Sequence, residues 1–411
     1  MDEGDAILPA DARARYAAAI VEAGVVVRRG DLVVVAGQPA HRELLVAVTE
    51  AAYGRGARHV DAEVVDPLVA AMRFRAGGRN AIGERSPWST ARARALMRPD
   101  SAIVSIAGEG EPGAFDGVDP RLLAEHSGAV RKALGFYTKA TLDGRVRWTI
   151  VAWPTPAWAG QVYPDETPLE GQRRLARDLL WFCRLGDEDG DGTEAWVRHA
   201  KALESRCRTL ARLKLERLEL RGPGTDLTVG IAPGTIWLGG REKTSSGRRT
   251  SPNMPTEEVF ASPAPAATEG TFRCSRPLNF HGRTIEGLAG EFRGGRLVRL
   301  EAASDEDREL VAAFLDTDAG ARRLGEVALV DASSRIGRAG RTYFNTLLDE
   351  NAAAHIALGA GFPNTREKGA SRVNDSVLHL DVMIGTDDFE VTGVAARDKR
   401  VPLIAGGEWQ I

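Results

Sequence analysis

Cysteine is scarce in this sequence. The three that occur, Cys183, Cys207 and Cys274, are widely separated and form no CxxC pair. This spacing indicates neither a disulfide framework nor a cysteine-ligated zinc site. It is typical of a protein that works in a reducing cytoplasm.

Long apolar runs and a strong net charge are also missing. No run approaches the roughly 18 apolar residues that a membrane span needs, and the first residues, Met1 to Asp5, are acidic where a secretory signal would be basic. The formal net charge of −3 gives no electrostatic reason to expect nucleic acid or an anionic membrane as a partner. We therefore expect a cytoplasmic protein that binds neither.

The length and composition are those of an ordinary globular enzyme. The 411 residues, 43% of them hydrophobic and 27% charged, are enough for two or three domains. We predict a first helix over residues 10–24. A β-α-β unit should follow, with strands over 31–37 and 59–65 and a helix over 41–54. Two further strands are predicted over 101–107 and 146–153. A β-α-β unit implies a parallel sheet. Its first strand-to-helix turn, residues 37–41, lacks a GxGxxG pattern, so no dinucleotide site is inferred.

The middle of the chain holds two unusual segments. Residues 153–160 are rich in proline and tryptophan and are expected to be an irregular packed loop, a cavity wall or a subunit contact. Residues 187–192 resemble a calcium loop, but position twelve is Arg198 instead of a glutamate, so we predict a solvated acidic turn. A helix from residue 193 to about 213 should follow.

The second half changes character. Short strand-like runs separated by glycine-rich turns predict an α+β or barrel-like unit, over residues 215–221, 227–231, 235–239, 292–298 and 327–330. We therefore predict an N-terminal α/β domain, residues 1–205, followed by a C-terminal α+β domain, residues 206–411.

Most of the candidate metal ligands lie between Leu324 and Asp381. The segment 377–384 alternates with period two, so His379 and Asp381 share one face of a strand. Same-face neighbours on a strand are about 6–7 Å apart, which lets two side chains reach one metal ion or a pair of ions. This spacing favours metal chemistry.

A second histidine comes with acidic neighbours. Asn351 is a good helix N-cap and Gly359 a plausible stop, so His355 is predicted in the first turns of a short helix. Glu350 precedes the cap and could turn toward the same centre. A lone buried histidine is often only a core residue, but two histidines with Asp381, Glu326 and Glu350 close in sequence favour a metal site. In the adjacent pair Glu257 and Glu258, one carboxylate could be directed inward.

Several of these stretches together resemble the aminopeptidase T / aminopeptidase S (PepS) family of thermophilic-type metallopeptidases. The matching stretches run in order from about residue 150 to the C-terminus: 154–159, 221–230, 253–260, 324–330, 344–355 and 379–381. The resemblance implies a cytoplasmic, dimeric exopeptidase that removes N-terminal amino acids, with its active sites inside an enclosed cavity. It also implies two divalent metal ions, and zinc, cobalt and manganese are all admissible for such a mixed oxygen and nitrogen ligand set.

Carried over to this chain, the resemblance names the site residues. The metal ligands would be Glu258, Glu326, Glu350, His355, His379 and Asp381. Glu258 is chosen over Glu257 because its spacing to Glu326 fits the family pattern better. Glu257, or one of the ligand glutamates, would accept the proton of the attacking water.

The chain departs from the family at one position. Phe362 stands where the family has a tyrosine that is thought to assist catalysis, so peptidase activity could be weak or redirected. One alternative is a related metal-dependent hydrolase of a specialised, non-peptide amide. A second is a mononuclear non-haem iron dioxygenase that uses His355, His379 and Asp381, although such an enzyme has no use for three further acidic ligands. A third is a catalytically inactive binding or scaffold protein.

Overall fold

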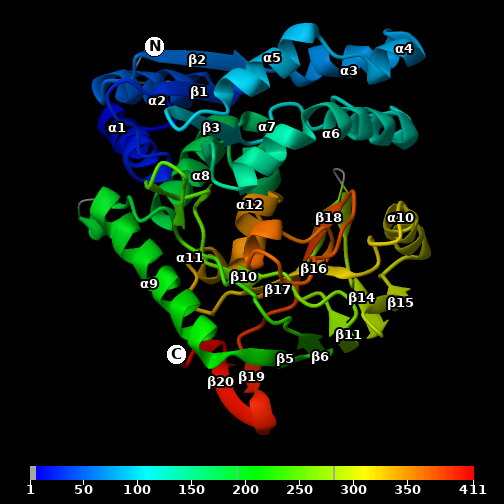
Figure 1. Ribbon diagram of the computed structural model, residues 1–411. Helices are drawn as coiled ribbons and strands as arrows, with labels where there is room; N and C mark the ends of the chain where they lie inside the picture. Colours follow the sequence, from blue (N-terminus) through cyan, green and yellow to red (C-terminus); the bar gives the residue numbers. More distant parts are fainter. Residues whose placement is uncertain (1–5, 191, 281–282) are drawn as a thin grey trace. The chain divides into compact units, whose positions relative to one another are not determined.

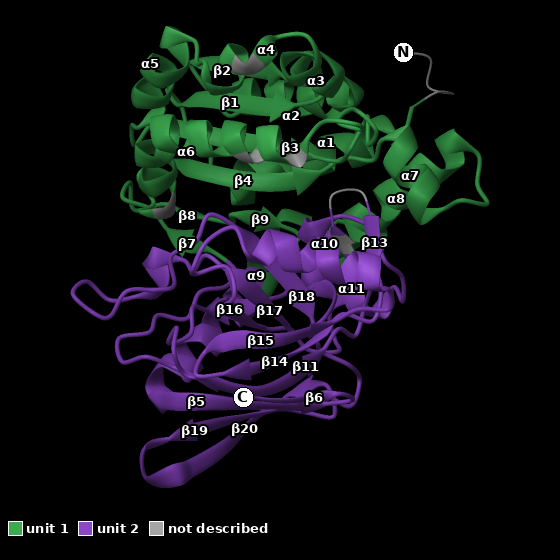
Figure 2. Ribbon diagram, turned by 90° about the vertical axis from the view of Figure 1, so that its right-hand side faces the viewer, with its two compact units in different colours: residues 1–199, 241–255 green, residues 200–240, 256–411 purple. Residues whose placement is uncertain are grey.

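The chain forms two compact units, each built from two stretches of sequence (Figure 2). Unit 1 comprises residues 1–199 and 241–255, and unit 2 comprises residues 200–240 and 256–411. The computed structural model describes residues 6–190, 192–280 and 283–411. Two predictions concern residues outside this description: the acidic N-terminus, residues 1–5, and the acidic turn, which includes Asp191. The predicted domain limits 1–205 and 206–411 stay a prediction.

Unit 1 is an α/β unit around a parallel sheet (Figure 1). The strand order is β2-β1-β3-β4-β9, and every ladder in it is parallel (Figure 2). Its strands are β1 (Leu32–Gly37), β2 (His59–Val64), β3 (Ser101–Ala107), β4 (Arg147–Ala152) and β9 (Asn253–Met254), with a separate hairpin of β7 (Glu242–Lys243) and β8 (Arg249–Thr250). The predicted β-α-β unit and the two strands after it are thus present.

Helices precede and connect these strands. They are α1 (Ala10–Ala19), which continues as a π-helix over Ile20–Gly24, α2 (Arg42–Gly54), α3 (Pro67–Arg75), α4 (Gly78–Gly83), α5 (Pro87–Leu96), α6 (Pro120–Leu142), α7 (Pro156–Val162) and α8 (Pro168–Phe182). The helix α9 (Gly192–Leu213) contributes residues to both units. None of the described helices combines the length and the apolar character that crossing a bilayer requires.

The prediction of irregular structure over residues 153–160 is correct for residues 153–155 and wrong from Pro156 onward. Residues from Pro156 onward form α7, because Thr155 caps the helix by accepting a hydrogen bond from the Trp158 amide at 3.2 Å. Pro156 occupies the first helical position, where a missing N–H costs nothing. Trp158 is buried, so the tryptophan that argued against regular structure instead anchors the helix.

Unit 2 contains two antiparallel sheets. The larger has the strand order β15-β14-β11-β6-β5-β19-β20-β21, and the smaller has the order β10-β16-β17-β18. The larger comprises β5 (Leu215–Gly222), β6 (Thr225–Gly230), β11 (Thr268–Arg273), β14 (Ala289–Arg293), β15 (Arg296–Glu301), β19 (Glu390–Ala395), β20 (Lys399–Ala405) and β21 (Glu408–Trp409). The smaller comprises β10 (Val259–Ala261), β16 (Leu324–Leu329), β17 (His355–Gly359) and β18 (His379–Met383). A hairpin of β12 (Leu278–Phe280) and β13 (Arg283–Ile285) and the helices α10 (Asp305–Leu315), α11 (Arg335–Arg338) and α12 (Thr346–Asp349) complete the unit.

Two predicted strands of unit 2 differ from the structure. Residues 292–298 are a hairpin and not one strand, because Gly294 and Gly295 adopt positive φ angles of 57° and 73° and turn β14 into β15. Residues 235–239 make only isolated bridges, from Thr235 to Arg366 and from Leu238 to Phe260. The mixed α/β character with parallel and antiparallel sheets is as predicted.

The predicted helix around His355 is also wrong. The helical turns come earlier, in α12 and a 3-10 turn over Glu350–Ala352, and His355 begins the strand β17. All five residues of β17 are buried between β16 and β18, with which they form two antiparallel ladders. The hydrogen bonds and burial of a central strand outweigh the helical preference of an alanine-rich segment, which is a weak local effect.

Candidate metal centre

The smaller sheet of unit 2 has two chemically different faces. Pairing sets Phe260 opposite Ala328, Ala328 opposite His355, and His355 opposite Met383. Because side chains alternate along each strand, these four share one face, which we call the ligand face. The opposite face is apolar and joins the core of unit 2 through Val259, Ala261, Leu324, Val327, Leu329, Ile356, Leu358, Leu380 and Val382.

Small residues leave space in the middle of the ligand face. Glu326 is paired with Ala357, and Ala357 with Asp381, so the residue between the two carboxylates carries only a methyl group. The ladder shifts register between Leu324 and Glu326, and a Cβ atom at the intervening Gly325 would lie 2.1 Å from the Ala360 carbonyl oxygen. Such a bulge can redirect the side chain that follows it. Glycine at this position therefore helps to aim Glu326.

Two overlapping sets of candidate ligands form on this face. Glu258, Glu326 and His355 offer atoms that all lie within 4.8 Å of one another, and so do Glu326, His379 and Asp381. The Nε2 atom of His355 lies 3.3 Å from the Glu258 carboxylate. The Nε2 atom of His379 lies 3.2 Å from Glu326 and 3.1 Å from Asp381. Glu326 belongs to both sets and therefore connects them.

The two sets differ in exposure. All members of the first set are buried, whereas His379 and Asp381 of the second set are partly exposed. The imidazole side chain of His379 retains 27% of its accessible surface. A small molecule in solvent can therefore reach the centre on the side of the second set.

Both imidazoles are held by backbone carbonyl groups. The Nδ1 atom of His379 lies 2.8 Å from the Ala360 carbonyl oxygen, and that of His355 lies 3.2 Å from the Ala353 carbonyl oxygen. A proton on Nδ1 that is donated to a carbonyl leaves the Nε2 lone pair for a metal ion. Both Nε2 atoms face the carboxylates, as ligands of a shared centre would.

The centre carries an excess of acidic groups. Burial lowers the pKa of His355, but the hydrogen bond and charge of Glu258 outweigh it and raise this pKa to about 10. Burial raises the pKa of Glu350 well above its usual range, and the charges of Asp381 and Glu258 raise it further. Glu350 thus lies in the field of the same carboxylates, although it belongs to neither set. Buried carboxylates this close together either take up protons or are compensated by cations.

The donor set fits divalent cations. The carboxylates of Glu258, Glu326 and Asp381 and the Nε2 atoms of the two histidines offer the mixed oxygen and nitrogen ligands that such ions accept, and Glu350 lies in the field of the same carboxylates. The six residues are Glu258, Glu326, Glu350, His355, His379 and Asp381. They are the six that the resemblance names as ligands, drawn from β16, β17, β18, the residue before β10 and the 3-10 turn before β17.

The adjacent glutamates diverge. Glu258 contacts His355, whereas the carboxylate of Glu257 accepts a hydrogen bond from the Arg335 amide at 3.3 Å, at the start of α11. Glu257, the predicted catalytic base, is buried but is not a member of either ligand set. Glu258 is the one that faces the imidazole.

Phe362 lies beside a candidate ligand. Its ring meets the imidazole of His379 edge to face, with 5.1 Å between centroids and 61° between planes. It meets the ring of Phe260 in the same way, at 5.4 Å and 65°. The position that carries the family's tyrosine in the resemblance is therefore adjacent to the centre.

Sequence reasoning missed the role of Asn351. The side chain is fully buried and is not a helix cap: its Oδ1 accepts a hydrogen bond from the Glu257 amide at 2.7 Å. Its Nδ2 donates to the Leu347 carbonyl at 3.0 Å and approaches Glu350 at 3.4 Å. Asn351 thereby links the segments that carry Glu258 and Glu350. In the sequence, only the position of this asparagine directly after Glu350 indicates such a role.

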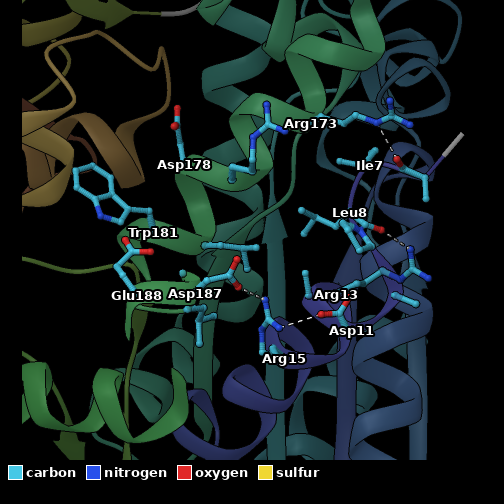
Figure 3. A pocket seen from close by; sticks show the side chains of 18 of the residues that line it. Ile7, Leu8, Asp11, Arg13, Arg15, Arg173, Asp178, Trp181, Asp187 and Glu188 are labelled. Carbon is cyan, nitrogen blue, oxygen red and sulfur yellow. Dashed lines mark hydrogen bonds and ion pairs between the residues drawn. The ribbon is translucent and has the colours of Figure 1, made fainter. Parts of the chain in front are cut away.

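Unit 1 has a cavity of its own, with a different character (Figure 3). Its volume is about 1160 Å³, and it lies among the start of α1, α8 and the acidic turn. Arg15 pairs with Asp11 at 3.0 Å and with Asp187 at 3.1 Å along one wall. None of the predicted site residues lines this cavity. Asp187 and Glu188 of the acidic run line its walls, and with Asp189 they form a short 3-10 helix.

Comparison with known proteins gives a consistent result. The sequence model of the family described as thermophilic metalloprotease (M29) matches residues 11–409. An aminopeptidase T of Thermus aquaticus is 35% identical over 89% of this chain and 90% of its own. An aminopeptidase 2 of Geobacillus stearothermophilus is 35% identical over 96% of this chain and 97% of its own.

Solved structures agree with the sequence comparison. Wild-type AmpT of Thermus thermophilus superposes with a TM-score of 0.89 at 32% identity, covering 98% of this chain and all of its own. A 2,5-dihydroxypyridine dioxygenase of Pseudomonas putida KT2440 has a TM-score of 0.53 at 12% identity, covering 97% of this chain and 96% of its own. The second likeness extends to the fold alone.

Proposed function

The chain belongs to the thermophilic metalloprotease (M29) family and is a metal-dependent aminopeptidase, and we propose that it acts through two divalent ions on the ligand face of unit 2. The proposed ligands are Glu258, Glu326, Glu350, His355, His379 and Asp381. The proposed ions are zinc, cobalt or manganese, since each accepts a mixed set of carboxylates and imidazoles.

One observation carries the proposal of two ions: Glu326 belongs to both ligand sets. A single ion would need only one of the sets. Two ions would be held by Glu258 and His355 in one set and by His379 and Asp381 in the other, and Glu326 would be available to both. Burial, together with the charges of Asp381 and Glu258, raises the pKa of Glu350, and bound cations would relieve this repulsion.

The chain's own residues then position the reaction. When bound, the ions would lower the pKa of a water molecule toward neutrality and polarise the scissile carbonyl. The bonds from His379 to the Ala360 carbonyl and from His355 to the Ala353 carbonyl keep both imidazoles oriented. A carboxylate accepts the proton of the water and returns it to the leaving amine. Glu257 and Glu350 are the two candidates for this step.

The acid–base assignment can be tested by two neutral substitutions. Glu350→Gln changes a proposed ligand and should lower metal content along with turnover, whereas Glu257→Gln should lower turnover at full metal content if Glu257 is the base. Loss of activity only in Glu350→Gln would leave Glu257 a structural role at the start of α11, where the Arg335 amide already contacts it.

The central experiment combines elemental analysis with hydrolysis of leucyl and arginyl amides, with and without a chelator. Two metal equivalents and chelator-sensitive release of the amino acid are expected. One iron equivalent without release would instead favour a mononuclear oxygenase. Against that alternative, His355 belongs to one ligand set while His379 and Asp381 belong to the other. Release from a non-peptide amide but from no peptide would favour a specialised amide hydrolase.

We further propose that the protein is a cytoplasmic homodimer, as the resemblance implies. Light scattering during gel filtration should give twice the mass of the 411-residue chain. A monomer at micromolar concentration would contradict this part of the proposal without affecting the metal site.

A further inference from the structure

Two phenylalanines border the ligand sets on the side of His379. Phe260 lies two residues after Glu258 in extended chain, so its side chain leaves β10 on the ligand face. Phe362 follows β17 and places its ring edge-on against Phe260 at 5.4 Å and against His379 at 5.1 Å. Three rings therefore form a row that begins at a candidate ligand.

Both phenylalanines are partly exposed. The two residues that flank Phe260 in β10, Val259 and Ala261, are fully buried on the other face of the sheet. The exposed rings lie beside His379, which belongs to the partly exposed ligand set. Aromatic surface next to a few converging polar groups is the usual composition of a small-molecule site.

Hydrogen bonds hold this aromatic surface in place. The Phe362 amide donates to Ser262 Oγ at 2.8 Å, and the Phe362 carbonyl accepts from Thr365 Oγ1 at 2.6 Å. The Ser262 amide donates to the same Thr365 oxygen at 3.3 Å. The loop that carries Phe362 is thereby tied to the end of β10. The two rings are arranged in advance, which reduces the entropy lost when a ligand binds.

We propose that Phe260 and Phe362 form the surface that receives the side chain of the substrate's N-terminal residue. The inference rests on the proposed function, because hydrolysis of the first peptide bond requires that residue to lie beside the ligand sets. An all-carbon surface favours peptides that begin with phenylalanine, leucine or another large apolar residue. An N-terminal aspartate is disfavoured, because its charged side chain would lose water against this surface without gaining a partner.

The first test compares kcat/KM for phenylalanyl, leucyl and glycyl amides. In the wild type, the phenylalanyl amide should exceed the glycyl amide by about tenfold or more, the scale of discrimination by an apolar pocket. Phe260→Ala should reduce this ratio by about tenfold. The control is Phe314→Ala, which changes another partly exposed phenylalanine of unit 2 in an edge-to-face pair, 4.9 Å from Phe280. It should leave the ratio unchanged.

A second test measures binding without turnover. Calorimetric titration of the metal-loaded protein with L-phenylalanine and with glycine, the two product amino acids, should show tighter binding of phenylalanine and a negative heat-capacity change. Phe260→Ala should weaken the binding of phenylalanine and leave that of glycine nearly constant. Phe260→Leu, a milder change, should give an intermediate ratio and guards against misfolding of the alanine variant.

The outcomes separate this inference from the proposed function. If Phe260→Ala lowers hydrolysis of glycyl and phenylalanyl amides equally at full metal content, the rings do not receive the side chain, although the aminopeptidase assignment holds. If the variant loses metal, the rings act by positioning His379, and the inference is again overturned. A wild type that binds no metal and cleaves no amide would contradict both.

Discussion

His379 contacts more parts of the candidate metal centre than one ligand pair. Its Nε2 atom lies within 3.2 Å of Glu326 and Asp381, its Nδ1 atom contacts the Ala360 carbonyl, and its ring packs against Phe362. Removing the imidazole therefore removes a proposed ligand and leaves Glu326 and Asp381 without the hydrogen-bond donor between them. We expect the protein to lose metal while it remains folded.

His379→Ala should accordingly lose metal and activity together. Without one of two nitrogen ligands, bound metal should fall below two equivalents and turnover on leucyl amide should drop by about a hundredfold or more. Elemental analysis and kinetics on the same preparation check this. His59→Ala, a change at an exposed histidine of unit 1, is the matched control. A His379→Ala protein with normal turnover would refute the proposed site.

Phe362→Tyr should raise peptidase turnover. A hydroxyl added to a ring beside His379 can donate a hydrogen bond to the oxyanion that forms during hydrolysis, and such donors are worth roughly 2.7–4 kcal/mol where they are essential. We expect kcat on leucyl amide to rise by up to about a hundredfold with KM little changed. An unchanged kcat would mean that the metal ions or another donor already stabilise the oxyanion.

At the scale of elements, periodicity predicted some parts of the centre and not others. The alternation around His379 and Asp381 correctly predicted β18, and the apolar run after Glu326 correctly predicted β16. The strand β17 was not predictable, because its preceding alanines favour a helix and only its burial between two strands decides against one. Likewise, the Phe260–Phe362 contact joins residues a hundred positions apart, which no local pattern reveals.

The turn between β1 and α2 gives unit 1 a pH-dependent contribution to stability. His41 is fully buried, accepts a hydrogen bond from the Gln38 amide on Nδ1 at 3.1 Å, and contacts the Gly108 carbonyl through Nε2 at 2.7 Å. This arrangement requires a neutral ring with its proton on Nε2. Burial lowers the pKa of His41 below 6.5, and the bond to Gly108 only partly opposes this effect.

Because the pKa of His41 is lowered in the folded state, the neutral ring contributes fully to the free energy of unfolding above about pH 6.5. This contribution is lost as the pH falls through the folded-state pKa. Denaturant unfolding of the wild type and of His41→Asn should therefore differ by a constant free energy at neutral and higher pH. The difference should shrink below about pH 6.5. A difference that grows on acidification would show that His41 is charged in the folded protein.

At the scale of the whole molecule, all six proposed ligands belong to unit 2. Metal that binds only the folded state stabilises it by about 2.7 kcal/mol at a hundred times the dissociation constant. Removing the metal should therefore loosen unit 2 and leave unit 1 unaffected.

Amide hydrogen exchange with and without chelator checks this expectation. Faster exchange is expected in β16, β17 and β18 after metal removal, and unchanged exchange in β1, β3 and β4. The His379→Ala protein should exchange at the faster rate without chelator and respond little to it. Equal effects in both units would contradict a metal centre confined to unit 2.

The interleaved course of the chain limits how this protein can be divided. Residues 241–255 belong to unit 1 and carry β9, which pairs with the edge of β4, while the stretches on either side of them belong to unit 2. No single cut in the gene yields either unit complete. A fragment intended to carry only the peptidase chemistry would have to span this excursion with a designed linker, because truncation at a single point would either retain part of unit 1 or remove part of unit 2.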